Sequence, residues 1–138
     1  MILLDTNVIS ETMRAVPDRH VLEWLDSLEE GAVGIPAVVM GELQYGVDLM
    51  PDGRRKEGLR LALERLAGEL YRGCIIPFDQ DAARHYGRLM ARRELSGRQM
   101  KILDAQIAAI ALANGAQLAT RDGDFAECGI GLINPWQA

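Results

Sequence analysis

Short apolar runs alternate along this chain with longer segments that have helical spacing. The apolar runs cover residues 1–4, 31–35, 74–76, 118–119 and 131–133. The segments between them carry apolar residues three and four positions apart, which is the spacing of an amphipathic helix. Strands separated by helices pair in parallel, and right-handed crossovers place helices on both faces of the sheet. We therefore expect an α/β fold with a central parallel sheet of about five strands.

Capping residues, prolines and glycines mark where the helices begin and end. We expect one short helix after Asp5 and further helices over about 18–28, 36–50, 54–70, 79–95 and up to 114. The helix over 54–70 repeats leucine along one face, which we expect to be buried. Those leucines are Leu59, Leu63, Leu66 and Leu70.

Length and composition predict one globular domain over residues 1–138. Hydrophobic residues make up 49% of the chain and charged residues 25%, which excludes a disordered polar chain. No apolar run approaches the roughly 20 residues of a membrane span, and the N-terminus does not resemble a signal peptide. Cys74 and Cys128 form no CxxC motif, so we expect reduced thiols and a cytoplasmic location.

The net charge of −5 argues against nucleic-acid binding, but the charges are unevenly distributed. Residues 84–101 contain six basic side chains and one acidic one, a local balance of +5. Arg84, Arg88 and Arg92 recur every four residues and so share one helix face. This stripe is either a solvated helix surface or a track for phosphate groups that leads toward Asp104.

Four acidic residues occupy positions where a carboxylate is costly. Asp5 ends the first apolar run, Glu42 interrupts an apolar helical segment, Asp104 lies in the alanine-rich helix, and Asp122 follows the fourth apolar run. A carboxylate beside a core needs a partner or a metal ion. If the first strand is central, its end and that of the fourth strand flank a topological switch point, where open α/β sheets place their sites. Asp5 and Asp122 then meet there, and flanking helices supply Glu42 and Asp104.

Each acid also has a purely structural explanation. Asp5 can cap the helix that follows it, and Asp104 can favour the positive end of a helix dipole. Asp122 and Asp124 can belong to an ordinary turn, and Glu42 can lie on a solvated helix face. Each of these explanations would have to apply independently, although all four acids are expected at the same edge of one sheet.

The neighbours of Glu42 favour a functional role. Val38, Tyr45 and Leu49 share its helix face, where a simple solvent-facing glutamate would have polar neighbours. Several carboxylates in one crevice repel each other unless a cation neutralises them. His20 and His85 form no ligand-spaced cluster, so the site suits a hard cation, Mg²⁺ or Mn²⁺, better than zinc.

Five stretches of the sequence resemble one known family. They are MILLDTNVISE at the start, GEL around Glu42, LDAQIAAIA around Asp104, LATRDGDF around Asp122 and the closing INPW. Together and in this order they resemble the PIN-domain endoribonuclease toxins, the VapC/FitB-like family of type II toxin–antitoxin systems. The resemblance implies a PIN-domain fold and a ribonuclease that depends on Mg²⁺, or on Mn²⁺. Such an enzyme hydrolyses RNA phosphodiesters with metal-activated water in an acidic pocket.

The resemblance also implies roles for particular residues. Asp5, Glu42, Asp104 and Asp122 correspond to the acidic quartet that is both catalytic and metal-binding, while Thr6, Asn7 and Thr120 would orient the carboxylates. Asp124 falls on a more variable position, so its role as a ligand is not implied.

Partners are implied by the resemblance alone. They are a cognate antitoxin that inserts a basic side chain among the acids, an RNA substrate, a second copy of the chain in a homodimer, and a toxin–antitoxin hetero-oligomer. Promoter DNA is expected only through the antitoxin, and no membrane is expected.

Two other functions compete with a nuclease. A non-catalytic PIN module would bind RNA or a protein partner without cutting, and the intact quartet argues against it. A signalling receiver would need paired acids after the first strand and a lysine after the fifth, whereas this chain has a single Asp5 and then Asn134-Pro135.

Overall fold

A computed structural model describes all 138 residues of the chain and contains the expected parallel sheet. The strand order is β3-β2-β1-β4-β5, and every neighbouring pair is parallel. The first strand is therefore central, as expected, and the order reverses between β1 and β4. The strands are β1 Ile2–Leu4, β2 Val33–Pro36, β3 Ile75–Ile76, β4 Gln117–Ala119 and β5 Leu132–Ile133.

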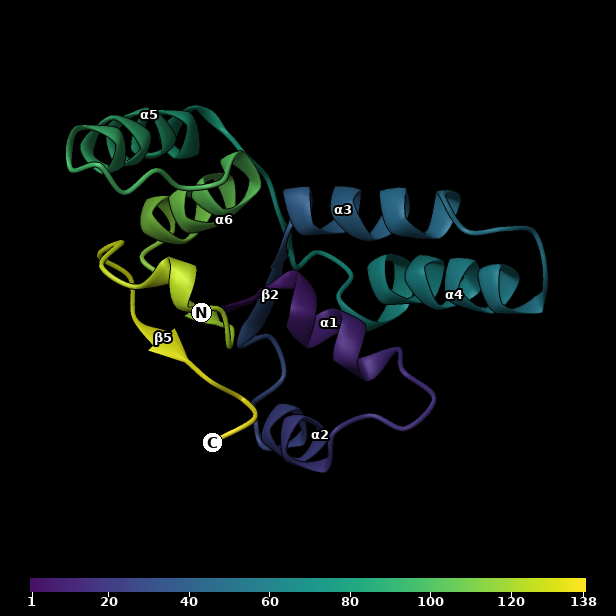
Figure 1. Ribbon diagram of the computed structural model, residues 1–138. Coiled ribbons are helices and arrows are strands. Elements are labelled where there is room, and N and C mark those ends of the chain that lie inside the picture. The colour runs from purple at the N-terminus through teal and green to yellow at the C-terminus, as the bar shows by residue number, and fades with distance from the viewer.

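Helices cover both faces of this sheet (Figure 1). The connections through α1 to α4 run in one direction across the sheet, and the connection through α5 and α6 runs back. Right-handed crossovers therefore place the two sets on opposite faces. The helices are α1 Thr6–Thr12, α2 Arg19–Asp26, α3 Ala37–Asp48, α4 Arg54–Arg65, α5 Gln80–Leu95 and α6 Ile102–Ala113. A π-helical turn, η1 Leu66–Leu70, extends α4, and a 3₁₀ turn, η2 Gly123–Phe125, follows β4.

Three helix starts are capped by aspartates at the positions where the sequence places them. The side chain of Asp5 accepts a hydrogen bond from the first backbone N–H of α1 at 2.8 Å. The Asp18 side chain accepts one from the backbone N–H of His20 in α2 at 2.8 Å, and Asp79 accepts one from Ala82 in α5 at 2.9 Å. Each cap satisfies a backbone donor that has no partner within its helix.

The core joins the central strands to buried residues of the helices on both faces of the sheet. Leu3 and Leu4 of β1 and Leu118 of β4 are fully buried. The helix α6 contributes a nearly continuous buried run from Ala105 to Ala111, interrupted only at Gln106. Its small alanine side chains let the helix pack closely on its neighbours. This close packing holds the first turn of α6 beside the carboxyl end of β1.

Two expected burial patterns are wrong. Leu70 is 62% exposed, because the π-helical turn changes the angular position of the last residues after α4. Tyr45 and Leu49 are each 67% exposed, because α3 buries the neighbouring face instead. The buried residues of α3 are Val39, Leu43 and Val47. Glu42 therefore does not interrupt a core-facing stripe.

Two simpler expectations hold. Cys74 and Cys128 are both free thiols, the first half-buried and the second buried. No helix combines the length and the apolar character that crossing a bilayer requires. Neither cysteine belongs to a disulfide.

We predict that Gly34→Val lowers the free energy of unfolding by about 1 to 3 kcal/mol, the usual cost of overpacking a core. A Cβ atom at Gly34 would lie 3.0 Å from Ile76 Cγ1 and 3.1 Å from Leu3 Cδ2. Urea denaturation measures the change. The matched control is Gly58→Val on α4, where no heavy atom lies within 4 Å of an added Cβ. Equal losses in both variants would contradict the packing explanation.

Candidate metal centre at the carboxyl end of the sheet

Asp5 leaves the central strand with its carboxylate buried and held from two sides. It is 4% exposed. The backbone N–H of Thr6 donates to Oδ1 at 2.8 Å, and the Thr120 hydroxyl donates to Oδ2 at 2.7 Å. Burial raises the pKa of Asp5, and the nearby charges of Asp122 and Glu42 raise it further, while the two hydrogen bonds lower it. This carboxylate is firmly oriented but poorly solvated.

The turn after β4 continues the same chain of hydrogen bonds. The backbone N–H of Asp122 donates to the Thr120 hydroxyl at 3.0 Å, and that hydroxyl donates to Asp5. The Asp122 carboxylate accepts a hydrogen bond from the backbone N–H of Asp124 at 2.9 Å and so caps η2. Thr120 thus connects the ends of β1 and β4 through its single hydroxyl group.

Glu42 reaches the site from α3. It is exposed, and its Oε2 accepts a short hydrogen bond from the Thr6 hydroxyl. Thr6 therefore serves two acids at once, Asp5 through its backbone and Glu42 through its side chain. These contacts fit the orienting role that the family resemblance implies for Thr6.

Asp104 comes from the first turn of α6. Burial, followed by the charges of Asp122, Asp5 and Asp124, raises the pKa of Asp104 from 3.8 to about 6, and Lys101 opposes the rise. The helix dipole favours an anion at this end. The repulsion from the other acids and the loss of water outweigh that benefit.

The four acids that the sequence predicts line one cavity. It has a volume of about 220 Å³, and its lining is Asp5, Thr6, Asn7, Glu42, Lys101, Leu103, Asp104 and Asp122. No ion pair of the structure involves any of the four acids. The negative charge in the cavity is therefore not neutralised by arginine or histidine, and Lys101 is the only basic residue in the lining.

Asp124 lies closer to the site than the sequence resemblance suggests. Carboxylate oxygens of Asp104, Asp122 and Asp124 all lie within 4.8 Å of one another. The spacing Asp-Gly-Asp explains this, because Asp122 caps η2 and turns the chain so that Asp124 faces back. Lys101 also lines the cavity, although the sequence motifs do not identify it as a site residue. Its position three residues before Asp104 is a visible signal, since it immediately precedes the helix.

The donor set suits a hard divalent cation. Carboxylate oxygens predominate, and Mg²⁺ and Mn²⁺ prefer oxygen ligands. Neither histidine lines the cavity: His20 lies on α2 beside Asp18, and His85 lies on α5. Burial, and then repulsion from the neighbouring acids, raise the pKa values of Asp5 and Asp104, and a divalent ion would offset both effects.

We predict that Asp104→Asn stabilises the metal-free protein at about pH 8, by roughly 2 to 5 °C in melting temperature. The folded-state pKa of Asp104, about 6, exceeds its ordinary value of 3.8. Ionisation therefore costs stability above about pH 6, and the cost fades as the pH falls from 6 toward 3.8. Thermal melts in chelator at about pH 8 and pH 5 measure the gain and its loss.

Asp52→Asn is the control for this prediction, because the Asp52 side chain is fully exposed on the turn before α4. Its melting temperature should change little at either pH. A stabilisation by Asp104→Asn of the same size at both pH values would rule out titration of Asp104 as the cause.

Comparison with known proteins identifies the family. The family model for the PIN domain matches residues 2–130. The chain is 42% identical to VapC ribonuclease Y4jK of Sinorhizobium fredii and 39% identical to toxin FitB of Neisseria gonorrhoeae, covering 99% of both chains in each case. A solved structure of FitAB bound to DNA superposes with a TM-score of 0.91 at 38% identity, covering 99% of this chain and 96% of that one.

The fold, the strand order and the shared cavity agree with these comparisons. The match extends over nearly the whole chain and includes every segment that carries one of the four acids. This chain therefore belongs to the PIN-domain family, as a VapC/FitB-like member.

Proposed function

We propose that this chain is a ribonuclease toxin that hydrolyses RNA phosphodiesters with the help of Mg²⁺ or Mn²⁺. One observation carries the proposal: four carboxylates from four separate segments line one cavity and have no ion-pair partner. The similarity to proteins named VapC ribonuclease and FitB toxin supports the same reaction class. We further propose that residues 1–138 act as a single PIN domain.

In this proposal Asp5, Glu42, Asp104 and Asp122 hold the cation, and Asp124 assists them. A divalent cation at this site supplies stabilisation of charge on a phosphodiester and promotes ionisation of water. Thr120 and Thr6 keep the carboxylates of Asp5 and Glu42 oriented, so that little reorganisation is needed when the cation arrives. Lys101 offers a positive charge at the rim, suited to a substrate phosphate.

The first test is cleavage of a mixed RNA pool by purified protein with Mg²⁺ or Mn²⁺. We predict cleavage that stops in chelator and falls more than about 100-fold in Asp5→Asn and Asp104→Asn. This follows because loss of a group that merely orients a metal ligand already costs about 10- to 100-fold. Asp52→Asn is the control and should retain full activity. Cleavage that survives chelator, or full activity in both site variants, would falsify the proposed mechanism.

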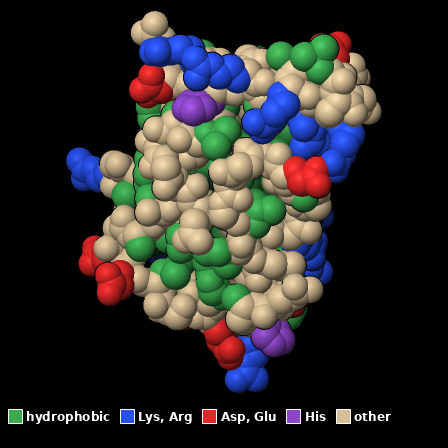
Figure 2. Space-filling view, turned by 90° about the vertical axis from the view of Figure 1, so that its left-hand side faces the viewer, with side chains coloured by type: hydrophobic (Ala, Val, Ile, Leu, Met, Phe, Trp, Pro, Cys, Tyr) green, Lys and Arg blue, Asp and Glu red, His purple; other side chains and the backbone are tan.

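The basic stripe of α5 is proposed as the approach for the RNA backbone. Figure 2 shows Lys and Arg side chains gathered at the upper edge of one face, where Figure 1 places α5. Arg84 pairs with Asp81 at 3.0 Å, whereas Arg88 and Arg92 are exposed and have no ion pair. The helix α5 packs against α6, whose first turn carries Asp104.

We predict that Arg88→Gln with Arg92→Gln weakens RNA binding and reduces the dependence of log affinity on log salt by about 1.4, two contacts at about 0.7 each for a single strand. Binding is measured in the Asp104→Asn background to prevent cleavage. Arg54→Gln with Arg72→Gln removes the same charge from exposed positions outside α5. An unchanged salt slope in the α5 variant would refute the phosphate track.

The partners are proposed from the family. We propose that an antitoxin blocks the acidic cavity, and that two copies of the chain associate. The similarity to FitAB, solved bound to DNA, supports a complex in which the antitoxin contacts promoter DNA. Co-expression with a candidate antitoxin, followed by light scattering of the purified material, measures both associations. A chain that stays monomeric and alone in that experiment contradicts the partner proposal but not the reaction.

A non-catalytic module that binds RNA or a protein partner is the alternative function. It predicts RNA binding without cleavage and without any effect of Asp5→Asn or Asp104→Asn. The uncompensated carboxylates argue against it, because a pure binding surface for RNA gains nothing from buried negative charge.

A further inference from the structure

The C-terminal turn after β5 directs Trp136 toward two segments that carry the acidic cavity. Asn134 Oδ1 accepts a hydrogen bond from the backbone N–H of Trp136 at 3.0 Å, and its carbonyl accepts one from Gln137 at 3.0 Å. Pro135 between them is buried. The turn is thus fixed by its own hydrogen bonds, and the indole ring has a defined direction.

One side of the indole faces Arg121. The guanidinium carbon of Arg121 lies 4.3 Å from the centroid of the Trp136 ring, which is close enough for a cation–π interaction. Arg121 is exposed and stands between Thr120 and Asp122, the two residues that continue the hydrogen-bond chain from Asp5. The ring therefore contacts the centre of the turn on which that chain depends.

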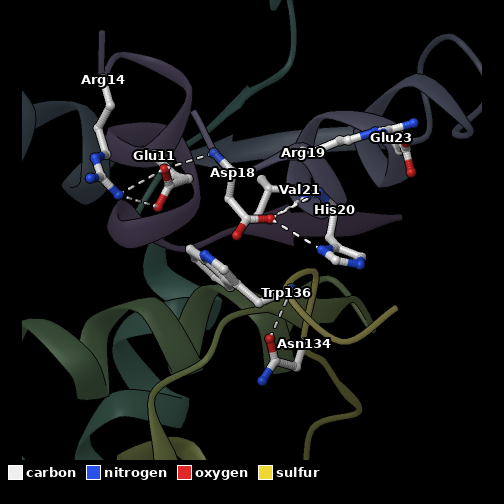
Figure 3. Close-up of polar contacts among 9 residues, drawn as sticks. All are labelled: Glu11, Arg14, Asp18, Arg19, His20, Val21, Glu23, Asn134 and Trp136. Atoms are coloured by element: carbon white, nitrogen blue, oxygen red, sulfur yellow. Dashed lines mark hydrogen bonds and ion pairs between the residues drawn. The ribbon is translucent and has the colours of Figure 1, made fainter. Parts of the chain in front are cut away.

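The other neighbour of the indole is Glu11 in the last turn of α1, whose first turn begins at Asp5 (Figure 3). The Glu11 side chain is only 3% exposed. It accepts hydrogen bonds from the backbone N–H of Asp18 at 3.0 Å and from Arg14 at 3.2 Å. Burial raises the pKa of Glu11, but the bonds from Asp18 and Arg14 outweigh it, so the pKa is lowered. Glu11 is a fixed anionic anchor.

We propose that Trp136 is a positioning residue, which braces the Arg121 turn against α1 and so holds Thr120 and Asp122 in register with Asp5. The inference rests on the proposed metal site and adds a residue that touches neither cation nor substrate. A positioning role differs from a purely structural role for Trp136 in one respect. It requires the contact between the indole ring and the exposed Arg121 side chain.

The charge of Arg121 makes the inference testable. Removing a positive charge next to an acidic cavity should tighten cation binding if electrostatics alone operates. Loss of positioning should weaken it instead. We predict that Arg121→Gln and Trp136→Leu each weaken Mn²⁺ binding about tenfold, the low end for groups that orient metal ligands. Calorimetric titration with Mn²⁺ alone measures this.

The two variants should also behave as a unit. The double variant should bind Mn²⁺ no more than about twofold more weakly than either single variant, because each already breaks the same contact. Trp136→Phe and Arg121→Lys, which keep a ring and a cation, should restore most of the affinity. With RNA, kcat should fall while KM stays near the wild-type value. Arg72→Gln is the charge control, because Arg72 is exposed and lies far from Arg121 in the sequence.

Mn²⁺ affinity in Arg121→Gln equal to or tighter than wild type overturns the inference. Because Arg121 is exposed, this variant tests the positioning role even if Trp136→Leu fails to fold. Wild-type protein that binds Mn²⁺ no better than Asp104→Asn contradicts the proposed function instead.

Hydrogen exchange of the metal-free protein then decides the inference on its own. The Asp122 amide donates to Thr120 Oγ1. It should exchange about tenfold faster in Arg121→Gln and Trp136→Leu than in wild type, while amides of α6 remain unchanged. Unchanged protection of Asp122 overturns the positioning role.

Discussion

A single hydroxyl group, that of Thr120, links the two acidic turns that follow the central strands β1 and β4. It donates to the Asp5 carboxylate and accepts from the Asp122 backbone, so it fixes the end of β1 relative to the end of β4. Both strands end at the point where the strand order reverses, and a main-chain hydrogen bond from the Asp5 N–H to the Ala119 carbonyl at 3.0 Å also joins them there. The Thr120 hydroxyl and this main-chain bond keep Asp5 and Asp122 close in spite of the repulsion between their carboxylates.

The fold resists that repulsion with rigid elements. Asp5 is the cap of α1, Asp122 is the cap of η2, and Asp104 lies in the first turn of a helix packed on the sheet. The packing of these helices and turns therefore fixes the backbone of each acidic residue, and with it the place of its carboxylate. The remaining cost is visible as raised pKa values at Asp5 and Asp104. An arrangement of this kind is less stable than a neutral one and is ready for a cation.

Much of this arrangement follows from local sequence patterns. The alternation of strands and helices predicts the parallel sheet, and a central first strand predicts the meeting of Asp5 and Asp122. Their capping roles and their roles in the cavity turn out to be compatible, because one oxygen of Asp5 caps α1 while the other binds Thr120.

Other parts depend on tertiary packing that no local pattern reveals. The exposure of Tyr45 and Leu49 follows from which face of α3 meets the sheet. Leu70 turns outward because of one extra residue in a helical turn. Glu11 is buried next to Trp136, which lies far from it in the chain. No motif or periodicity in the sequence indicates that the two residues meet.

The chain order of the site has a consequence for biosynthesis. The contact between Asp5 and Thr120 spans 115 residues, and the brace at Trp136 comes later still. A growing polypeptide can form β1, β2 and their helices, but it cannot close the cavity until β4 and Asp122 have left the ribosome. The acidic pocket is thus complete only after Asp122 has emerged, and a product truncated between Asp104 and Asp122 would carry three of the acidic segments without the fourth.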